Sequence, residues 1–189
     1  MKKILCFIIL IAAALSVVSF AEVTSRITRQ YTIINPEIIT YYDGDKVIAV
    51  KTLTESGEVK TLTGHIPNGQ VRRYYPNGKL FVESYYKNDK LDGSSKAYFS
   101  TGTLEASVSY KNGKLNGPAK EYYANGTLRR SDNFVKGQME GLTKIYNDNG
   151  TIRSEINYLH GAPDGICRFY DRNGKLVREE HYINGKLTK

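Results

Sequence analysis

From about residue 70 onward, apolar and polar side chains alternate in short stretches that glycine-containing turns separate. Leu80, Val82 and Tyr86, for example, fall on alternate positions of one such stretch. A period of two is typical of a β-strand, because successive side chains of a strand point to opposite faces of the sheet. No window after residue 21 has the 3.6-residue period of an amphipathic helix. The pattern therefore predicts an all-β fold.

The whole pattern recurs every 24 residues, without an insertion from Gly78 to the end. Three series of glycines keep this step. The first is Gly78, Gly102, Gly126, Gly150 and Gly174; the second is Gly113, Gly137, Gly161 and Gly185; the third is Gly93, Gly117, Gly141 and Gly165. Such self-similarity is the signature of a repeat architecture, in which each unit packs mainly on its neighbours.

Each unit is predicted to be a β-hairpin. The segment Tyr75-Pro76-Asn77-Gly78 fits a type I turn with proline second and glycine last, and the glycine also suits the left-handed position of a three-residue loop. This register pairs Tyr74 with Leu80 on one face. Strict alternation then adds Val82 and Tyr86 to that face, so we expect a core ladder of Tyr and Leu. Gly102 and Gly126 are expected to need positive φ.

A two-residue loop is the alternative, and it would pair Tyr75 with Leu80. The longer loop is favoured because the Tyr75 position becomes Asn147 and Asp171 in later units, whereas Tyr74 and Leu80 keep their character throughout. A second turn, such as residues 111–114, links one hairpin to the next. The architecture expected is an elongated antiparallel array of 24-residue β-hairpin repeats.

The chain divides into three parts on this interpretation. Residues 1–21 have a charged start, an apolar run over residues 4–18 and a small-x-small ending, as in a secretory signal peptide. We expect cleavage between Ala21 and Glu22, and export to the periplasm, the cell envelope or the medium; about 15 apolar residues are few for a membrane anchor. Residues 22–43 form an N-terminal segment that includes a possible capping strand. Residues 44–189 form the array, with five clear units from about residue 70 and degenerate units before them.

Charge and cysteine content narrow the classes of partner. The formal net charge of +8 becomes +6 after cleavage, since the leader holds two lysines and no acidic residue. A positive excess favours anionic partners, but the charges are spread along the chain, so we expect no nucleic-acid binding. Cys167 alone remains after cleavage, so no internal disulfide is expected.

Residues of the kinds that carry catalysis do not converge in the pattern. His65, His160 and His181 occupy different places in the repeat and lack ligand spacing. Glu83, Glu155 and Glu179 recur at one position; we interpret them as cross-strand partners for basic residues. The sequence therefore predicts a protein that is not an enzyme, with no cofactor and no metal site.

The unit Tyr-Tyr-Ala-Asn-Gly-Thr-Leu over residues 122–128, preceded by Tyr-Lys-Asn-Gly-Lys-Leu-Asn-Gly over residues 110–117, resembles the bacterial variant of the MORN (membrane occupation and recognition nexus) repeat. The resemblance covers about residues 54–189. It implies a hairpin-repeat sheet and a binding or scaffolding role. Bacterial proteins of this type are often labelled antitoxin components of toxin–antitoxin systems, and some eukaryotic relatives are associated with acidic phospholipids.

Two rows of residues are candidates for contact with a partner. The first is basic and could bind anions: Arg72, Lys96, Lys120, Lys144 and Arg168. The second is an aromatic strip for a sugar chain or an extended peptide: Tyr75, Phe99 and Tyr123, with Tyr85 expected on the same face. The alternatives are that the basic side chains shield the Tyr rings with their alkyl stems, and that the rings pack on each other or under the N-terminal segment.

The function expected is that of a non-enzymatic exported binding or scaffolding module. Its partner is expected to be a protein or a cell-envelope polymer, with an anionic membrane surface as a further possibility. The alternatives are an antitoxin-like immunity protein that neutralises a toxin, and a structural protein that self-assembles through its end strands.

Overall fold

The structure is a computed structural model, and it describes residues 28–32, 38–43, 46–54, 59–75 and 77–188. In these ranges every regular element is an antiparallel β-strand, which confirms the predicted all-β class. The same ranges contain no helix long and apolar enough to cross a bilayer. The proposed signal peptide lies outside the described residues. The chain splits into two compact units, residues 1–89 and 90–189.

The first unit contains a four-stranded antiparallel sheet and one hairpin. The sheet consists, in chain order, of β1 (Thr28–Thr32), β2 (Ile38–Asp43), β3 (Lys46–Leu53) and β4 (Val59–Gly64). The hairpin consists of β5 (Gly69–Tyr74) and β6 (Leu80–Lys87).

Two strands of this sheet, β3 and β4, fall in the part of the chain that was expected to hold degenerate repeat units. Strands β3 and β4 pair with each other, and β3 also pairs with β2. At the end of β4 the chain takes a positive φ of 79° at Gly64, where a Cβ atom would overlap the carbonyl oxygen of Ile48. Only glycine fits this close approach of two backbones. The repeat hairpins therefore begin with β5.

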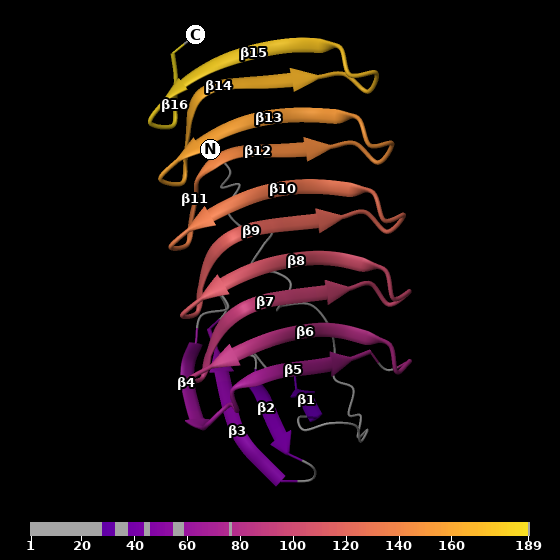
Figure 1. Cartoon of the computed structure of the whole chain (residues 1–189), viewed down its shortest axis with the longest axis vertical. Helices are drawn as coiled ribbons and strands as arrows, with labels where there is room; N and C mark the ends of the chain where they lie inside the picture. The colour runs from indigo at the N-terminus through magenta and orange to yellow at the C-terminus, as the bar shows by residue number, and fades with distance from the viewer. Residues whose placement is uncertain (1–27, 33–37, 44–45, 55–58, 76, 189) are drawn as a thin grey trace. The chain divides into compact units, whose positions relative to one another are not determined.

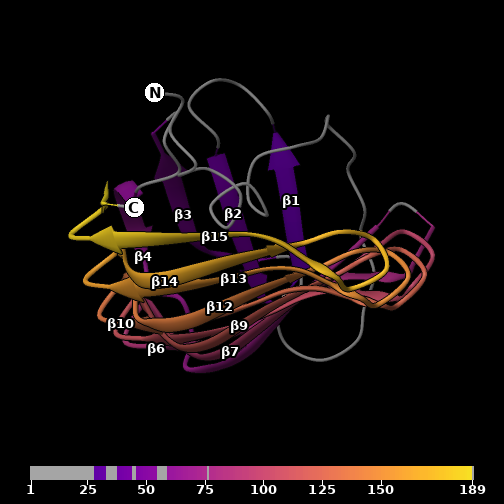
Figure 2. The same ribbon diagram turned by 90° about the horizontal axis from the view of Figure 1, so that it is seen from above.

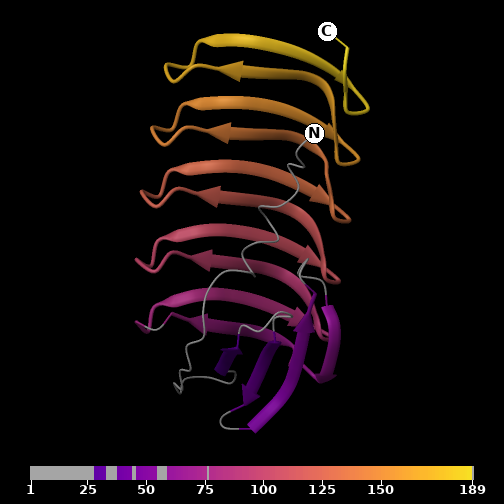
Figure 3. The ribbon, with the colours of Figure 1, turned by 180° about the vertical axis from the view of Figure 1, so that it is seen from behind.

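The second unit is a single antiparallel sheet of successive hairpins (Figure 1). Its strands are β7 (Lys90–Tyr98), β8 (Leu104–Lys111), β9 (Lys114–Tyr122), β10 (Leu128–Val135), β11 (Gln138–Met139), β12 (Gly141–Tyr146), β13 (Ile152–Leu159), β14 (Ala162–Tyr170), β15 (Leu176–Ile183) and β16 (Lys186–Leu187). Seen from above, β7 to β15 overlie one another as one curved layer (Figure 2). The hairpin tips follow one edge of this sheet, and the turns between hairpins follow the other (Figure 3).

The hairpin tips have the predicted geometry. The amide of each tip glycine donates to the carbonyl oxygen three residues earlier, as from Gly102 to Phe99 at 2.8 Å and from Gly126 to Tyr123 at 2.8 Å. Both glycines have positive φ, 97° and 85°. Tyr74 pairs with Leu80 in the same register, so the three-residue loop with a left-handed glycine is confirmed.

Each turn between hairpins places two consecutive residues at positive φ, as at Asn112 (49°) and Gly113 (79°). This is the conformation of a type I′ turn, whose twist matches that of the flanking strands. Lys136 and His160 occupy the first position in two of these turns, at 51° and 52°. An acidic or amide side chain 20 residues upstream accepts the amide of that first residue, as Asn116 does for Lys136 at 3.1 Å.

The expected core face is right for Val82 and Tyr86 but wrong for the first pair of the hairpin, Tyr74 and Leu80. Tyr74 pairs with Leu80, but Arg73 pairs with Val82, so a β-bulge inserts one extra residue, Phe81, into the second strand. A bulge displaces the alternation by one residue. Val82 and Tyr86 are therefore buried, whereas Tyr74 lies on the opposite face and is 47% exposed.

Small side chains form the buried face in the second unit. The most deeply buried small side chains are Ala97, Ala106, Ala119, Thr143, Ser154 and Cys167. Because the unit is a single layer, a small side chain is shielded by its larger cross-strand neighbours, such as Val108 and Phe134, which are also buried. In the first unit an aromatic pair has the corresponding role, since the Tyr41 and Tyr86 rings meet edge-on with centroids 6.1 Å apart.

Candidate ligand-binding face

The sheet of the second unit has a face opposite its buried side chains, and we call this the open face. Its central row crosses the strands from β7 to β15. It consists of Lys96, Ser107, Lys120, Ser131, Lys144, Glu155, Arg168 and Glu179. Each of these residues is paired in register with the next one, so four of the five predicted basic residues stand in this row. The fifth, Arg72, occupies the equivalent position of the hairpin β5–β6 in the first unit.

Carboxylates neutralise three of the five basic residues. Arg72 donates to Glu83 at 3.0 Å, Arg168 to Glu179 at 3.0 Å, and the Lys144 ammonium lies 2.9 Å from Glu155. The hydrogen bond from Lys144 lowers the pKa of the Glu155 carboxyl, and the Tyr170 hydroxyl adds a second bond at 2.9 Å. The same contact with Glu155 raises the pKa of Lys144. These cations are therefore held in cross-strand pairs.

Lys96 and Lys120 have serines where the other basic residues have glutamates. Lys96 pairs in register with Ser107, and Lys120 lies between Ser107 and Ser131. Neither lysine forms an ion pair with a described carboxylate. The backbones of the two lysines stand two strands apart, about 10 Å, and Ser107 lies between them. A cation–hydroxyl–cation row of this kind suits an anionic group or chain.

The aromatic strip is divided between the two units, and its rings are not simply presented to solvent. In the first unit Tyr75 packs on Phe81 at 4.7 Å, and the buried Arg73 guanidinium lies 4.6 Å from the Phe81 ring. Tyr75 therefore joins the buried side of its hairpin. Tyr85 is exposed, and its hydroxyl accepts from the Gln70 amide at 3.1 Å.

Tyr85 lies on the face opposite Tyr75, which corrects the expectation that they share one face. The bulge at Phe81 is the reason, because it places both Phe81 and Val82 on the buried side. In the second unit the Tyr123 hydroxyl donates to the Tyr146 carbonyl oxygen at 2.8 Å, and the Arg129 guanidinium lies 5.9 Å from the Tyr123 ring. Phe99 is half-buried. The contacts of Tyr75 and Tyr123 make these rings part of the packing.

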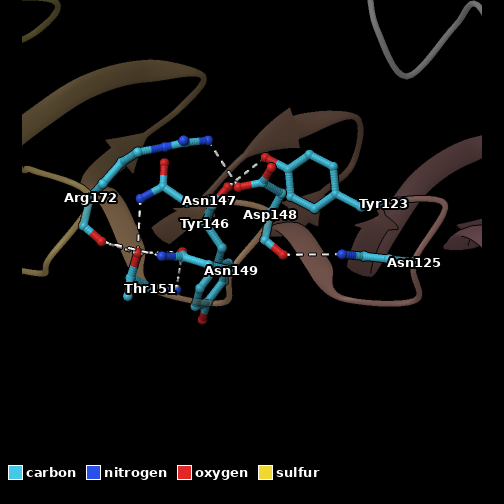
Figure 4. Close-up of polar contacts among 8 residues, drawn as sticks. All are labelled: Tyr123, Asn125, Tyr146, Asn147, Asp148, Asn149, Thr151 and Arg172. Carbon is cyan, nitrogen blue, oxygen red and sulfur yellow. Dashed lines mark hydrogen bonds and ion pairs between the residues drawn. The ribbon is translucent and has the colours of Figure 1, made fainter.

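The hairpin tips are connected by side chains to the tips that follow them (Figure 4). The Asn125 amide donates to the carbonyl oxygen of Asp148 at 3.1 Å, and the Asn149 amide donates to that of Arg172 at 3.3 Å. Arg172 in turn pairs with the Asp148 carboxylate at 3.0 Å. The Asn-rich tip over residues 147–150 is therefore a structural turn, since its polar groups bond to the neighbouring tip.

A buried polar cluster on the other face was not found from the sequence. The Asp132 carboxylate, 2% exposed, accepts from Arg130 Nε at 2.6 Å and from Thr143 Oγ1 at 2.7 Å. Burial is the largest single effect and acts to lower the pKa of Arg130, but the hydrogen bond to Asp132 and the neighbouring negative charges together outweigh it, so the pKa is raised. The available signal was an acidic residue, Asp132 or Glu180, at a repeat position that is Ser84, Val108 or Ile156 in the other units.

The described residues contain no group of three His, Cys, Asp or Glu side chains positioned to hold a metal ion. The His65 and His160 rings lie beside Asp89 and Glu140, each in a turn between hairpins. Burial raises the pKa of the Cys167 thiol, which disfavours the reactive thiolate.

Successive hairpins with tip glycines and linked turns define a hairpin-repeat protein. Its open face offers side chains for contact with a partner. The description MORN repeat variant matches five segments of the chain: residues 67–88, 91–112, 115–136, 139–160 and 163–184. The chain therefore belongs to the MORN repeat variant family. No curated protein matches it.

Proposed function

We propose that this protein is an exported, non-enzymatic binding module whose open face holds an anionic polymer of the cell envelope at Lys96 and Lys120. The observation that carries the proposal is the central row of that face, whose other cations, Lys144 and Arg168, are paired with carboxylates while these two lie beside serines. Export is supported by the charged, apolar and small-residue order of residues 1–21. Repeat sheets of this family commonly serve as binding or scaffolding modules.

The chemistry of the neighbouring side chains agrees with a polymer. The Ser107 and Ser131 hydroxyls donate and accept, so they suit phosphate, sulfate or carboxylate groups and sugar hydroxyls alike. Tyr98 and Tyr122 stand two residues further along the same strands and are half-buried. Such rings offer an apolar surface with a polar tip. A chain that crosses from β7 to β9 meets a positive charge at each of these two strands.

The test is a binding titration of the purified protein with poly(glycerol phosphate) and with dextran sulfate. The Lys96→Gln/Lys120→Gln variant should bind about tenfold more weakly, since each exposed pair contributes on the order of 0.2–1 kcal/mol. The matched control is Lys136→Gln/Lys175→Gln, which removes the same charge from exposed turn positions. Its affinity should stay within about twofold of the parent. An equal loss in both variants would mean that net charge alone attracts the polymer.

Export has a separate test. N-terminal sequencing of the protein from the producing cell should begin at Glu22. An intact Met1 on protein from the cytoplasmic fraction would contradict export, and it would favour the antitoxin-like alternative instead.

A further inference from the structure

The open face carries an exposed aliphatic strip near the turns between the last hairpins. Its members are Val135, Leu142, Leu159, Ile166 and Ile183, each 38–51% exposed. They come from five strands in succession, β10, β12, β13, β14 and β15. In the earlier hairpin of this unit the corresponding positions hold Ser94 and Lys111. Exposed apolar side chains gathered on one face indicate an interaction site. Two polar residues lie in register beside them, Asn157 opposite Leu142 and His181 opposite Ile166.

These side chains share the open face with the central row of charged and serine residues. Leu142 alternates with the buried Thr143, and Ile166 alternates with the buried Cys167, so both point away from the packed side. Leu142 and Ile166 stand two residues before Lys144 and Arg168 on the same strands, about 7 Å along each strand. The strip and the charged row therefore run side by side across β12 to β15.

The charges of the central row alternate in sign over these four strands. It reads Lys144, Glu155, Arg168 and Glu179, from β12 to β15. A two-fold rotation reverses the order of such a row. If the axis lies along the strands and passes between Glu155 and Arg168, Lys144 of one copy faces Glu179 of the other, and Glu155 faces Arg168. Every charge then meets its opposite.

The same rotation brings the aliphatic strips together. An axis along the strands leaves each position along the strand unchanged, so the strip of one copy lies over the strip of the other. Leu142 then comes beside Ile183 of the second copy, and Leu159 comes beside Ile166. In each pair the two side chains are offset by two residues along the strand. The side chains can therefore interlock. An interface that is complementary to itself in this way is isologous, as in most homodimers. Two sheets packed face to face lie about 10 Å apart at a small angle.

We propose that this face docks a second copy of the chain, as a two-fold dimer through β12 to β15. The interface is separate from Lys96 and Lys120, which stand on β7 and β9, so each dimer presents two polymer-binding rows. It also differs from association through end strands, because it uses side chains of the face and not backbone groups of a sheet edge.

Sedimentation velocity of the purified protein between 1 and 200 µM tests the proposal, and it should show a reversible monomer–dimer equilibrium. The Leu142→Ser/Ile166→Ser variant should raise the dimer Kd at least tenfold and keep its affinity for poly(glycerol phosphate). The control is Val177→Ser/Leu187→Ser, which removes exposed aliphatic side chains that lie off the open face. It should leave the dimer Kd within about twofold.

A charge exchange tests the two-fold axis without altering the strip. Lys144→Glu should weaken the dimer, because the new carboxylate of one copy then faces Glu179 of the other. Adding Glu179→Lys should restore association, since opposite charges meet again across the interface. Within one chain these two positions stand three strands apart, on β12 and β15, and each exchanged side chain has a like-charged neighbour, Glu155 or Arg168. A merely structural role of the two residues would not give this recovery.

A protein that stays monomeric at 200 µM overturns the proposal. So does dimerisation that is weakened by the Val177/Leu187 control and not by the Leu142/Ile166 variant, which would indicate association through the end strands. Failure of the double charge exchange to restore association would contradict the two-fold axis. Polymer binding that is lost while the dimer persists contradicts the proposed function alone.

Discussion

At the scale of single residues, the turns between hairpins have a backbone conformation that favours asparagine at their first position. The first residue of each turn is left-handed, with φ between 49° and 52° at Asn88, Asn112, Lys136, His160 and Asn184. Asparagine tolerates this region better than other side chains with a Cβ atom. Three of these five turns have asparagine at this position. The turns with lysine or histidine there are therefore less stable than they would be with asparagine.

Lys136→Asn should therefore stabilise the protein, by on the order of 0.5–1 kcal/mol. The reciprocal change, Asn112→Lys, should destabilise it by a similar amount. Urea denaturation of both variants measures the effect. If both variants change the free energy of unfolding in the same direction, backbone conformation does not explain the effect. Other contacts of the lysine and asparagine side chains would then decide the stability.

The electrostatic pairs on the open face contribute to stability only over a limited pH range. The pKa of Glu155 is lowered by the hydrogen bond from Lys144. A group with a lowered folded-state pKa contributes stability above its unfolded pKa and loses that contribution as the pH falls through the folded value. The Glu155 contribution is thus present above about pH 5 and disappears in more acidic solution.

Thermal melts of the parent and of Glu155→Gln should accordingly differ more at pH 7 than at pH 3. The difference between the two melting temperatures should shrink as the pH falls to 3, because protonation of the parent carboxyl removes its attraction to Lys144. A difference that stays constant from pH 7 to pH 3 would show that the Lys144–Glu155 pair adds nothing to stability.

At the scale of the hairpin, the β-bulge decides which side chains are buried. Ala106, 1% exposed, lies on the packed face, whereas Leu104 is half-buried on the open face with Tyr98. The larger side chain is therefore the less important one for packing. The bulge shifts Leu104 and Ala106 to opposite faces, although they are two residues apart.

Ala106→Leu should destabilise the fold by about 1–3 kcal/mol, since the site has no room for the added atoms. Leu104→Ala should cost less than about 1.5 kcal/mol, because the half-exposed side chain loses little buried area. Chemical denaturation ranks the two variants. The opposite ranking would mean that the strand alternates strictly and that Leu104 is the core residue.

The comparison of hairpins shows what the sequence could predict. The glycine series and the Tyr–Leu register were sufficient for the turns and for the pairing of Tyr74 with Leu80. The bulge at Phe81 was missed because no glycine or other residue marks it. The assignment of Tyr74 and Leu80 to the core face, together with Val82 and Tyr86, was wrong for this reason. The cluster of Arg130, Asp132 and Thr143 was missed because most units hold no acidic residue at the Asp132 position; the arginine–acid pair recurs only in the last hairpin, as Arg178 and Glu180.

At the scale of the whole molecule, the pairing of strands shows which basic residues have carboxylate partners. The recurrence of Glu83, Glu155 and Glu179 at one repeat position predicted such cross-strand partners, without saying which basic residue each one meets. The pairing of strands gives Arg72, Lys144 and Arg168 glutamate partners, and leaves Lys96 and Lys120 beside serines. The candidate site is therefore confined to β7–β10, a smaller region than the five-residue stripe predicted.

The most direct test of the central claim is an NMR titration of the isotope-labelled protein with poly(glycerol phosphate). The account predicts that amide shifts concentrate on β7 to β10, around Lys96, Ser107, Lys120 and Ser131, and that added salt reverses them. Resonances of the buried Cys167, on β14, should change least. Shifts concentrated around Lys144 and Arg168 instead, or none at saturating polymer, would contradict the assignment of this face as the binding surface.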